Sequence, residues 1–260
     1  MRMFDALSDC DRIALAKRKM ERVLNHVINL AAIHENNAIV VFSPMLVDQI
    51  PRSYAAHAFN VFQHVMHDFE MVRLCALWNS PQNAEDETES IPTVVAIIDH
   101  PSVIDALVQT ERSHWGDITA RNMASLNPAL TELELEAIKQ NEDKFGEGQA
   151  SKARSDLLEA ISQTKRLRAS PRFTALKNHR DKYLAHSLAS TKHEKKTGQP
   201  LPLAKYNYAT KLFDLSIPIV EKLYHCVTGK GFDISQSQKI SKRRAEALWG
   251  RCTFTIGDND

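Results

Sequence analysis

One short stretch of this 260-residue chain concentrates side chains that perform acid–base and phosphate chemistry. Residues 178–187 read NHRDKYLAHS and contain Arg180, Tyr183 and His186. If the stretch is helical, Arg180 and His186 lie about 120° apart around the axis and ~9 Å apart along it, with Tyr183 between them. His179 falls in the same sector. One helix face then presents a cation, two imidazoles and a phenol, which packing against a core does not require.

These side chains suit a phosphodiester substrate. Histidine exchanges protons near neutral pH and acts as a general acid or base. Arginine holds a phosphate through its fork of donors and stabilises negative charge that develops during its reaction. RNA supplies its own nucleophile, the 2′-OH, so this set predicts RNA cleavage without a metal. The alternative is a solvated helix face, because Arg and His six residues apart also occur by chance.

The charge distribution gives RNA further weight. The chain has a formal net charge of only +1, but its sequence divides into an acidic half, residues 1–150, and a basic half, residues 151–260. The most basic fifty residues, 151–200, contain the Arg–His stretch. Such asymmetry indicates an anionic partner for the second half. The competing interpretation is that the two halves attract each other, within one chain or across a dimer.

Composition favours an all-α fold. Glycine is scarce, at 8 residues, and apolar residues recur with a period near 3.6. The apolar runs are far shorter than the ~20 residues of a membrane span, and no secretory signal is visible at the start. The four cysteines are scattered, which favours a reducing cytoplasm. The pattern predicts these helices: 9–34, 53–78, 90–98, 101–113, 131–146, 150–169, 171–190, 204–227 and 237–249.

Several details of these helices bear on function. Ser170 and Pro171 form an N-cap and first turn for the helix that carries the Arg–His stretch. In the helix 53–78 we expect an apolar stripe that includes Phe62 and Phe69 to face the core. The opposite side then carries His57, His64, His67 and Asp68, which we interpret as facing solvent or a partner. His64 and Asp68 have the spacing of metal ligands, but no second ligand cluster completes a site.

The Arg–His stretch resembles the signature of the HEPN superfamily (higher eukaryotes and prokaryotes nucleotide-binding). That signature is an Arg, then a polar residue, then a His after four to six intervening residues. Arg180, Asp181 and His186 fit it, and Lys182 and Ala185 match common members. An acidic loop over 84–89 followed by Ser-Ile-Pro and an apolar helix, the sequence Tyr-Asn-Tyr at 206–208, and the helix 242–249 resemble the abortive-infection U-type branch. The resemblance covers roughly residues 10–250.

The resemblance implies a HEPN-type helical bundle, with extra N-terminal and C-terminal helices, that dimerises and brings two Arg–His motifs into one cleft. Many such proteins are metal-independent endoribonucleases of phage-defence or toxin–antitoxin systems and leave a 2′,3′-cyclic phosphate. His186 would then be the acid/base, Arg180 the phosphate ligand and Asp181 its polar support. Tyr183 joins the catalytic set on geometry alone. No cofactor or metal is expected.

Neighbouring basic side chains complete the predicted interface. We expect RNA phosphates to contact Lys177, His179, Lys182, Arg172 and Arg168. The chain is interpreted as one HEPN-like domain over 1–260, with an acidic N-terminal region over 1–129, a motif-bearing region over 130–230 and a C-terminal helix and tail over 231–260. Expected partners are RNA, a second copy, and an antitoxin or phage-derived trigger. The main alternative is a non-catalytic RNA-binding or antitoxin-like protein, and a third is a structural helical oligomer.

Overall fold

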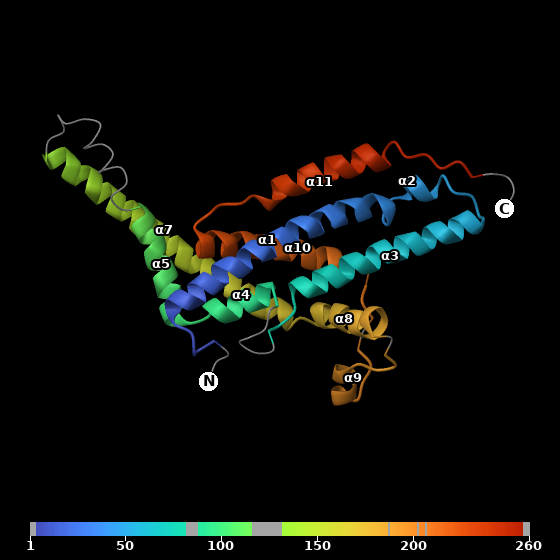
Figure 1. Ribbon diagram of the computed structural model, residues 1–260, viewed down its shortest axis with the longest axis horizontal. Helices are drawn as coiled ribbons and strands as arrows, with labels where there is room; N and C mark the ends of the chain where they lie inside the picture. The colour runs from blue at the N-terminus through green and yellow to red at the C-terminus, as the bar shows by residue number, and fades with distance from the viewer. Residues whose placement is uncertain are drawn as a thin grey trace. The chain divides into compact units, whose positions relative to one another are not determined.

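The computed structural model describes residues 4–81, 88–115, 132–186, 188–201, 203–205 and 207–256. Within these residues all regular structure is helical (Figure 1), as the sequence predicts. No single helix in the described ranges is long and apolar enough to cross a membrane, although the bent pair of α4 and α5 passes by length and composition. The start of the predicted helix 131–146, the residues 116–130 before it and most of the acidic loop 84–89 lie outside the described residues.

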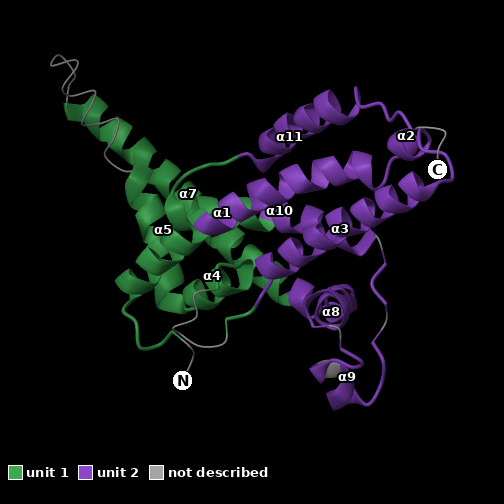
Figure 2. Cartoon of the chain, turned by 45° about the vertical axis from the view of Figure 1, so that its right-hand side comes forward, with its two compact units in different colours: residues 1–21, 80–165, 219–232 green, residues 22–79, 166–218, 233–260 purple. Residues whose placement is uncertain are grey.

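The chain forms two compact units, each built from three separate stretches (Figure 2). Unit 1 consists of residues 1–21, 80–165 and 219–232, and unit 2 of residues 22–79, 166–218 and 233–260. The candidate site lies entirely within unit 2.

Unit 1 has an apolar core centred on a short helix. Its elements are the first turns of α1 (Asp9–Val40), α4 (Ile91–Ile98), α5 (Pro101–Trp115), most of α7 (Glu132–Arg168) and the last turns of α10 (Asn207–Thr228). Ser90 caps α4 as predicted, accepting a hydrogen bond from Thr93 N at 3.2 Å. The buried Arg12 side chain donates to Ile97 O at 2.8 Å, so the carbonyl end of α4 is satisfied.

Unit 2 packs against one side of the long helix α3. Its elements are the rest of α1, α2 (Pro44–Val47), α3 (Tyr54–Leu77), α8 (Pro171–His179), the π-helix η1 (Arg180–Ala185), α9 (Lys192–Thr197), the first turns of α10, and α11 (Ile234–Trp249). Trp78 is fully buried, and its indole Nε1 donates to Ser216 Oγ at 2.9 Å. Because a buried indole N–H needs a partner, this bond fixes the end of α3 against α10.

Two predicted helix breaks are wrong. α1 continues through Asn36 and Asn37 to Val40 because the side-chain NH2 groups of both residues find acceptors on α1 and α3. Asn36 donates to Ala32 O, and buried Asn37 donates to Met66 O and to the Glu70 carboxylate. Likewise, α7 runs unbroken through Gly146 and Gly148.

Gly146 has a packing role in α7 rather than a breaking one. It is buried, and a Cβ at this position would lie 3.1 Å from the backbone oxygen of Arg112 in α5. Glycine therefore permits the close approach of α5 and α7 at this point, despite its cost in helix propensity.

Candidate functional site

The helix that carries the Arg–His stretch begins as predicted. Ser170 caps α8, and its Oγ accepts a hydrogen bond from Phe173 N at 3.2 Å, with Pro171 in the first turn. Phe173, Ala175 and Leu176 are buried, and the Phe173 ring lies 6.1 Å from the Trp78 ring. These apolar contacts fasten α8 beside the end of α3.

The predicted continuous α-helix over 171–190 is wrong, because the backbone widens into a π-helix at Arg180. The π-helix η1 spans Arg180–Ala185 and ends at His186, whose φ of −137° lies outside the helical region. Leu188 N then donates to Lys182 O at 2.7 Å, closing the wider turn. The 120° relation between Arg180 and His186 assumed 3.6 residues per turn and therefore does not hold. Single π turns inside α-helices occur often at functional sites.

Arg180 is held by two neighbours. Its Nη1 donates to Asn79 Oδ1 at 2.9 Å, and its Nε donates to Asp181 Oδ1 at 2.8 Å, with Nη2 also on Asp181. Asn79 stands just after α3, and nothing in the sequence connects it with a residue about a hundred positions away. The guanidinium is thus oriented from both sides, by Asn79 and by Asp181.

His186 stands apart from this arrangement. It is exposed and follows the last residue of η1. Among the described residues of this single chain no hydrogen bond joins it to Arg180.

His179 and Tyr183 form an aromatic pair one turn apart. Their ring centroids lie 5.1 Å apart, and the Lys182 ammonium lies 5.7 Å from the Tyr183 ring. Burial lowers the pKa of His179, an effect that Asp68 opposes and His67 reinforces. His179 is therefore a neutral imidazole at pH 7.

Glu194 ties four segments together beside this pair. Its carboxylate accepts hydrogen bonds from Thr191 N (2.9 Å), Asn178 Nδ2 (3.2 Å) and Leu201 N (3.3 Å), and pairs with Lys182 at 3.3 Å. Thr191 and Glu194 form a capping box that starts α9, between the predicted helices 171–190 and 204–227, where no helix was predicted. These bonds, the one from Thr191 N foremost, lower the pKa of Glu194 to about 2.

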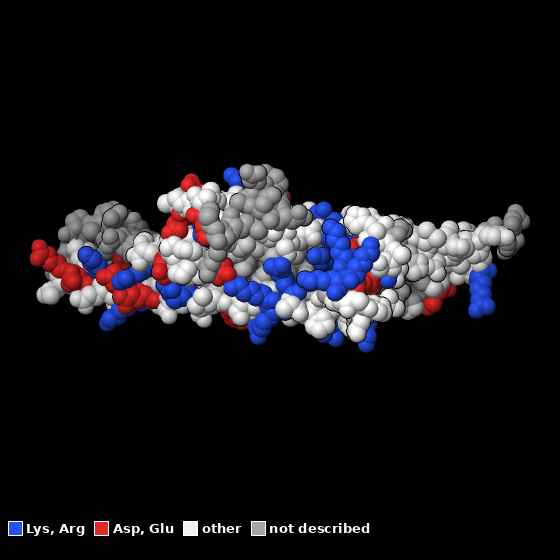
Figure 3. All heavy atoms as spheres, turned by 90° about the horizontal axis from the view of Figure 1, so that it is seen from below, with Lys and Arg blue, Asp and Glu red and all other residues white. Residues whose placement is uncertain are grey.

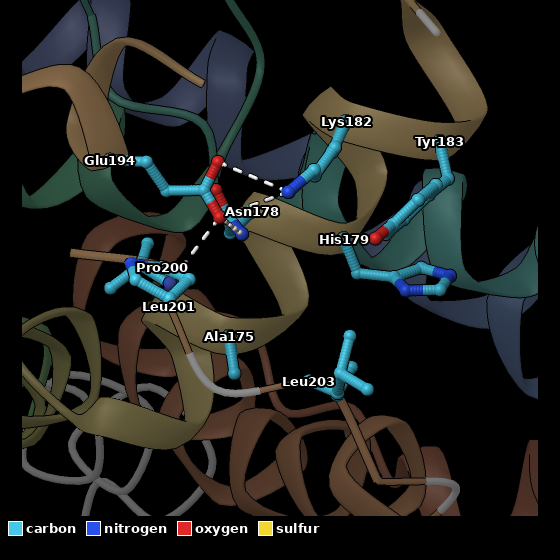
Figure 4. A pocket seen from close by; sticks show the side chains of 10 residues that line it. Ala175, Asn178, His179, Lys182, Tyr183, Glu194, Pro200, Leu201 and Leu203 are labelled. Carbon is cyan, nitrogen blue, oxygen red and sulfur yellow. Dashed lines mark hydrogen bonds and ion pairs between the residues drawn. The ribbon is translucent and has the colours of Figure 1, made fainter. Parts of the chain in front are cut away.

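A cavity of about 250 Å³ lies between this carboxylate and the aromatic pair. Figure 4 shows Glu194, Asn178 and Lys182 joined on one side and the rings of His179 and Tyr183 on the other, with Leu203 below. The walls of the cavity thus combine aromatic, aliphatic and polar groups, and one lining residue, His179, directly precedes Arg180 in the chain.

The predicted RNA-binding side chains differ in their surroundings. Lys177 and Arg168 are exposed, and the Arg172 guanidinium lies 5.5 Å from the Tyr208 ring. Lys182, by contrast, is paired with Glu194. Figure 3 shows Lys and Arg side chains gathered on the face formed by α8 and α9; the α9 lysines are exposed, namely Lys192, Lys195 and Lys196.

The predicted faces of α3 are confirmed only in part: His57 and His64 are exposed as expected, but His67 is buried and the apolar stripe does not face the core. Phe62 and Phe69 are exposed, whereas His67 and Glu70 are buried. The buried Glu70 carboxylate is stabilised because it accepts a hydrogen bond from Asn37 and shares a 2.6 Å hydrogen bond with His34. Among the described residues, no three His, Cys, Asp or Glu side chains gather in a metal-binding arrangement.

Comparison with known families decides what kind of protein this is. A family model described as HEPN_AbiU2, AbiU2, matches residues 16–248. The chain belongs to the HEPN AbiU2 family. The match includes every predicted site residue and confirms the resemblance drawn from the Arg–His motif. No curated protein and no solved structure gives a significant match.

Proposed function

We propose that this HEPN AbiU2 protein is a metal-independent endoribonuclease of a bacterial phage-defence or toxin–antitoxin system. The observation that carries the proposal is the Arg180 guanidinium, oriented by Asp181 and Asn79 beside an exposed lysine-rich face, in the family's Arg–His motif. Arg168, Arg172 and Lys177 add charge for the RNA backbone. Lys182 is reassigned to shaping the cavity, because Glu194 pairs with it.

The reaction needs two proton transfers. A base removes the proton of the 2′-OH, the 2′-oxygen attacks phosphorus, and the P–O5′ bond breaks. The departing 5′-oxygen takes a proton from an acid, so the products are a 2′,3′-cyclic phosphate and a 5′-OH end. Arg180 stabilises the extra negative charge on the phosphoryl oxygens. We assign His179 to contact with the flanking nucleotide, and we move Tyr183 from the predicted catalytic set to the same role because its ring lies 5.1 Å from that of His179.

A second copy supplies the missing partner for His186. One imidazole cannot remove one proton and deliver another in the same step, and His186 has no hydrogen bond to Arg180 within the described chain. A symmetric homodimer provides two His186 side chains, one as base and one as acid. The proposed site is therefore composite, with both motifs facing one RNA strand.

The test is RNA cleavage by purified protein in EDTA, with the ends of the products identified by mass. His186→Ala and Arg180→Ala should lose cleavage while keeping their helical circular dichroism. His114→Ala, which changes an exposed histidine of α5, is the matched control and should cleave normally. Equal cleavage by wild type and His186→Ala would overturn the proposed site.

Mixing experiments test the composite site. When wild-type and His186→Ala chains are co-expressed in equal amounts, random pairing leaves about a quarter of the dimers with two intact histidines. Activity should therefore fall to about a quarter of that of the all-wild-type dimer. A fall to about half would mean that each chain acts alone.

The alternative is a non-catalytic RNA-binding or antitoxin-like protein. The hydrogen bonds of Arg180 to Asp181 and Asn79 favour this alternative, since these N–H groups of the guanidinium already have acceptors. This alternative predicts RNA binding that weakens with salt, no cleavage by the wild type, and weaker binding in Arg180→Ala.

A further inference from the structure

The helix α3 exposes a row of large apolar side chains. The exposed fractions are 80% for Tyr54, 51% for Val61, 40% for Phe62, 60% for Val65 and 51% for Phe69. At 100° per residue these five positions fall within a sector of about 100°. The opposite side of α3 is the one that packs in unit 2. The row, which we call the α3 stripe, is thus an outward apolar face and not a core face.

The α3 stripe is large for a free surface. A fully exposed aromatic side chain offers about 150–250 Å², so Tyr54, Phe62 and Phe69 together with the two valines present on the order of 500 Å². A patch of that size equals the largest apolar patch of a typical monomer, which is often functional. A standard interface buries about 800 Å² per partner, so the α3 stripe supplies more than half of one.

The spacing of the α3 stripe indicates a helical partner of the same kind. Four residues of the stripe, Tyr54, Val61, Val65 and Phe69, form with Ala58 and Val72 a row at intervals of three and four residues, the pattern of helices that pack side by side, and Phe62 lies beside this row. None of these six side chains is charged, which disfavours an RNA or an anionic surface as the occupant. In a two-fold symmetric dimer the same surface of each copy contacts its equivalent, so the surface must be complementary to itself. An uncharged row with this spacing meets that requirement.

The position of the motif relative to α3 limits how two copies can pair. Arg180 hydrogen-bonds Asn79, and the charges of Arg180 and Asp181 act on the pKa of the nearby Cys75 thiol. The motif therefore lies at the C-terminal end of α3. In an antiparallel pair centred on Val65, Asn79 is about 14 residues from the axis, so the two Asn79 residues lie ~42 Å apart along the helices. No single phosphodiester spans that separation.

We propose that two copies pair through the α3 stripe with their α3 helices parallel. This inference rests on the proposed function, because it is the shared cleavage site that requires both motifs at one end. In the parallel pair each residue of the stripe faces its own equivalent, and the two Arg180 residues stand at the same level.

Thiol cross-linking of the full chain distinguishes the two orientations. Cys10 and Cys252 are changed to Ser because they are accessible, whereas Cys75 and Cys226 are buried and are kept. Val61→Cys, Val65→Cys and Phe69→Cys are then made singly and treated with a short thiol cross-linker. The parallel pair predicts covalent dimers from all three variants. Cross-linking of Val65→Cys alone, with Val61→Cys joining only Phe69→Cys in mixtures, identifies the antiparallel pair and overturns the inference.

Light scattering and cleavage assays separate this inference from the proposed function. Val65→Glu should be monomeric and should lose most RNA cleavage, whereas Leu248→Glu, which changes an exposed leucine of α11, should stay dimeric and active. A dimer that persists in Val65→Glu overturns the inference and leaves the proposed function standing. Covalent dimers from all three cysteine variants, together with no RNA cleavage by the wild type, would support the interface and overturn the proposed function.

Discussion

Asn79 is the sharpest point at which the geometry of the site can be tested. Its side-chain oxygen accepts a 2.9 Å hydrogen bond from Nη1 of the partly buried Arg180. Asn79→Ala removes this acceptor and leaves Asp181 as the remaining contact. A hydrogen bond to a charged group is worth about 1.5–3 kcal/mol, and ~1.4 kcal/mol corresponds to a tenfold rate change. Because Asp181 still orients the guanidinium, we expect the lower end of that range.

The assay is the initial rate of single-stranded RNA cleavage at substrate concentrations below KM. Asn79→Ala should lower kcat/KM about tenfold while the melting temperature changes by only a few degrees. Asn79→Asp should not restore the rate, because a second carboxylate neutralises the charge that a phosphate needs. Asn60→Ala, at an exposed position of α3, is the control. Unchanged rates in Asn79→Ala, or an equal loss in the control, would refute the role given to Asn79.

Three further predictions concern stability. Hydrogen bonds to the Glu194 carboxylate, the one from Thr191 N foremost, lower the pKa of Glu194 to about 2. Their stabilisation of the fold is complete above the ordinary glutamate pKa of 4.5 and is lost as the pH falls toward 2. Glu194→Gln should therefore flatten acid denaturation between those values, and an unchanged acid limb would contradict this. Burial lowers the pKa of His34, but the hydrogen bond and charge of Glu70 outweigh it, so the net shift is upward from 6.5. That stabilisation is complete below pH 6.5 and is lost as the pH rises through the raised pKa; Glu70→Gln should abolish this alkaline loss in melting curves from pH 6 to 9. Gly148→Ala, at an exposed helical position with no atom within 4 Å of the new Cβ, should stabilise by about 0.5–1 kcal/mol, and a lower melting temperature would count against it.

The features that the sequence predicts correctly are local ones. Ser90 and Ser170 cap helices because a hydroxyl satisfies an N–H three residues on, whatever the rest of the fold does. The all-α class follows in the same way from periodicity and the scarcity of glycine. The family match to residues 16–248 was likewise anticipated, from the Arg–His motif together with the patterns at 84–98, 206–208 and 242–249.

The features that sequence reasoning misses depend on contacts between distant segments. A π turn at Arg180 leaves no mark in apolar periodicity, and Asn79 meets Arg180 only after α3 and α8 have packed. The stripe with Phe62 and Phe69 was assigned to the core, although both are exposed, because both sides of α3 carry apolar residues. Glu70 is buried only because His34 and Asn37 hydrogen-bond to it. A charged side chain can be buried when another helix supplies hydrogen-bond partners, and the sequence of α3 alone does not show those partners.

The Arg180–His186 site is tested most directly by the products that purified protein makes from RNA in EDTA. The account predicts fragments ending in a 2′,3′-cyclic phosphate from the wild type and none from His186→Ala of equal helicity. Identical fragments from both proteins, or RNA binding by the wild type without any cleavage, would contradict it.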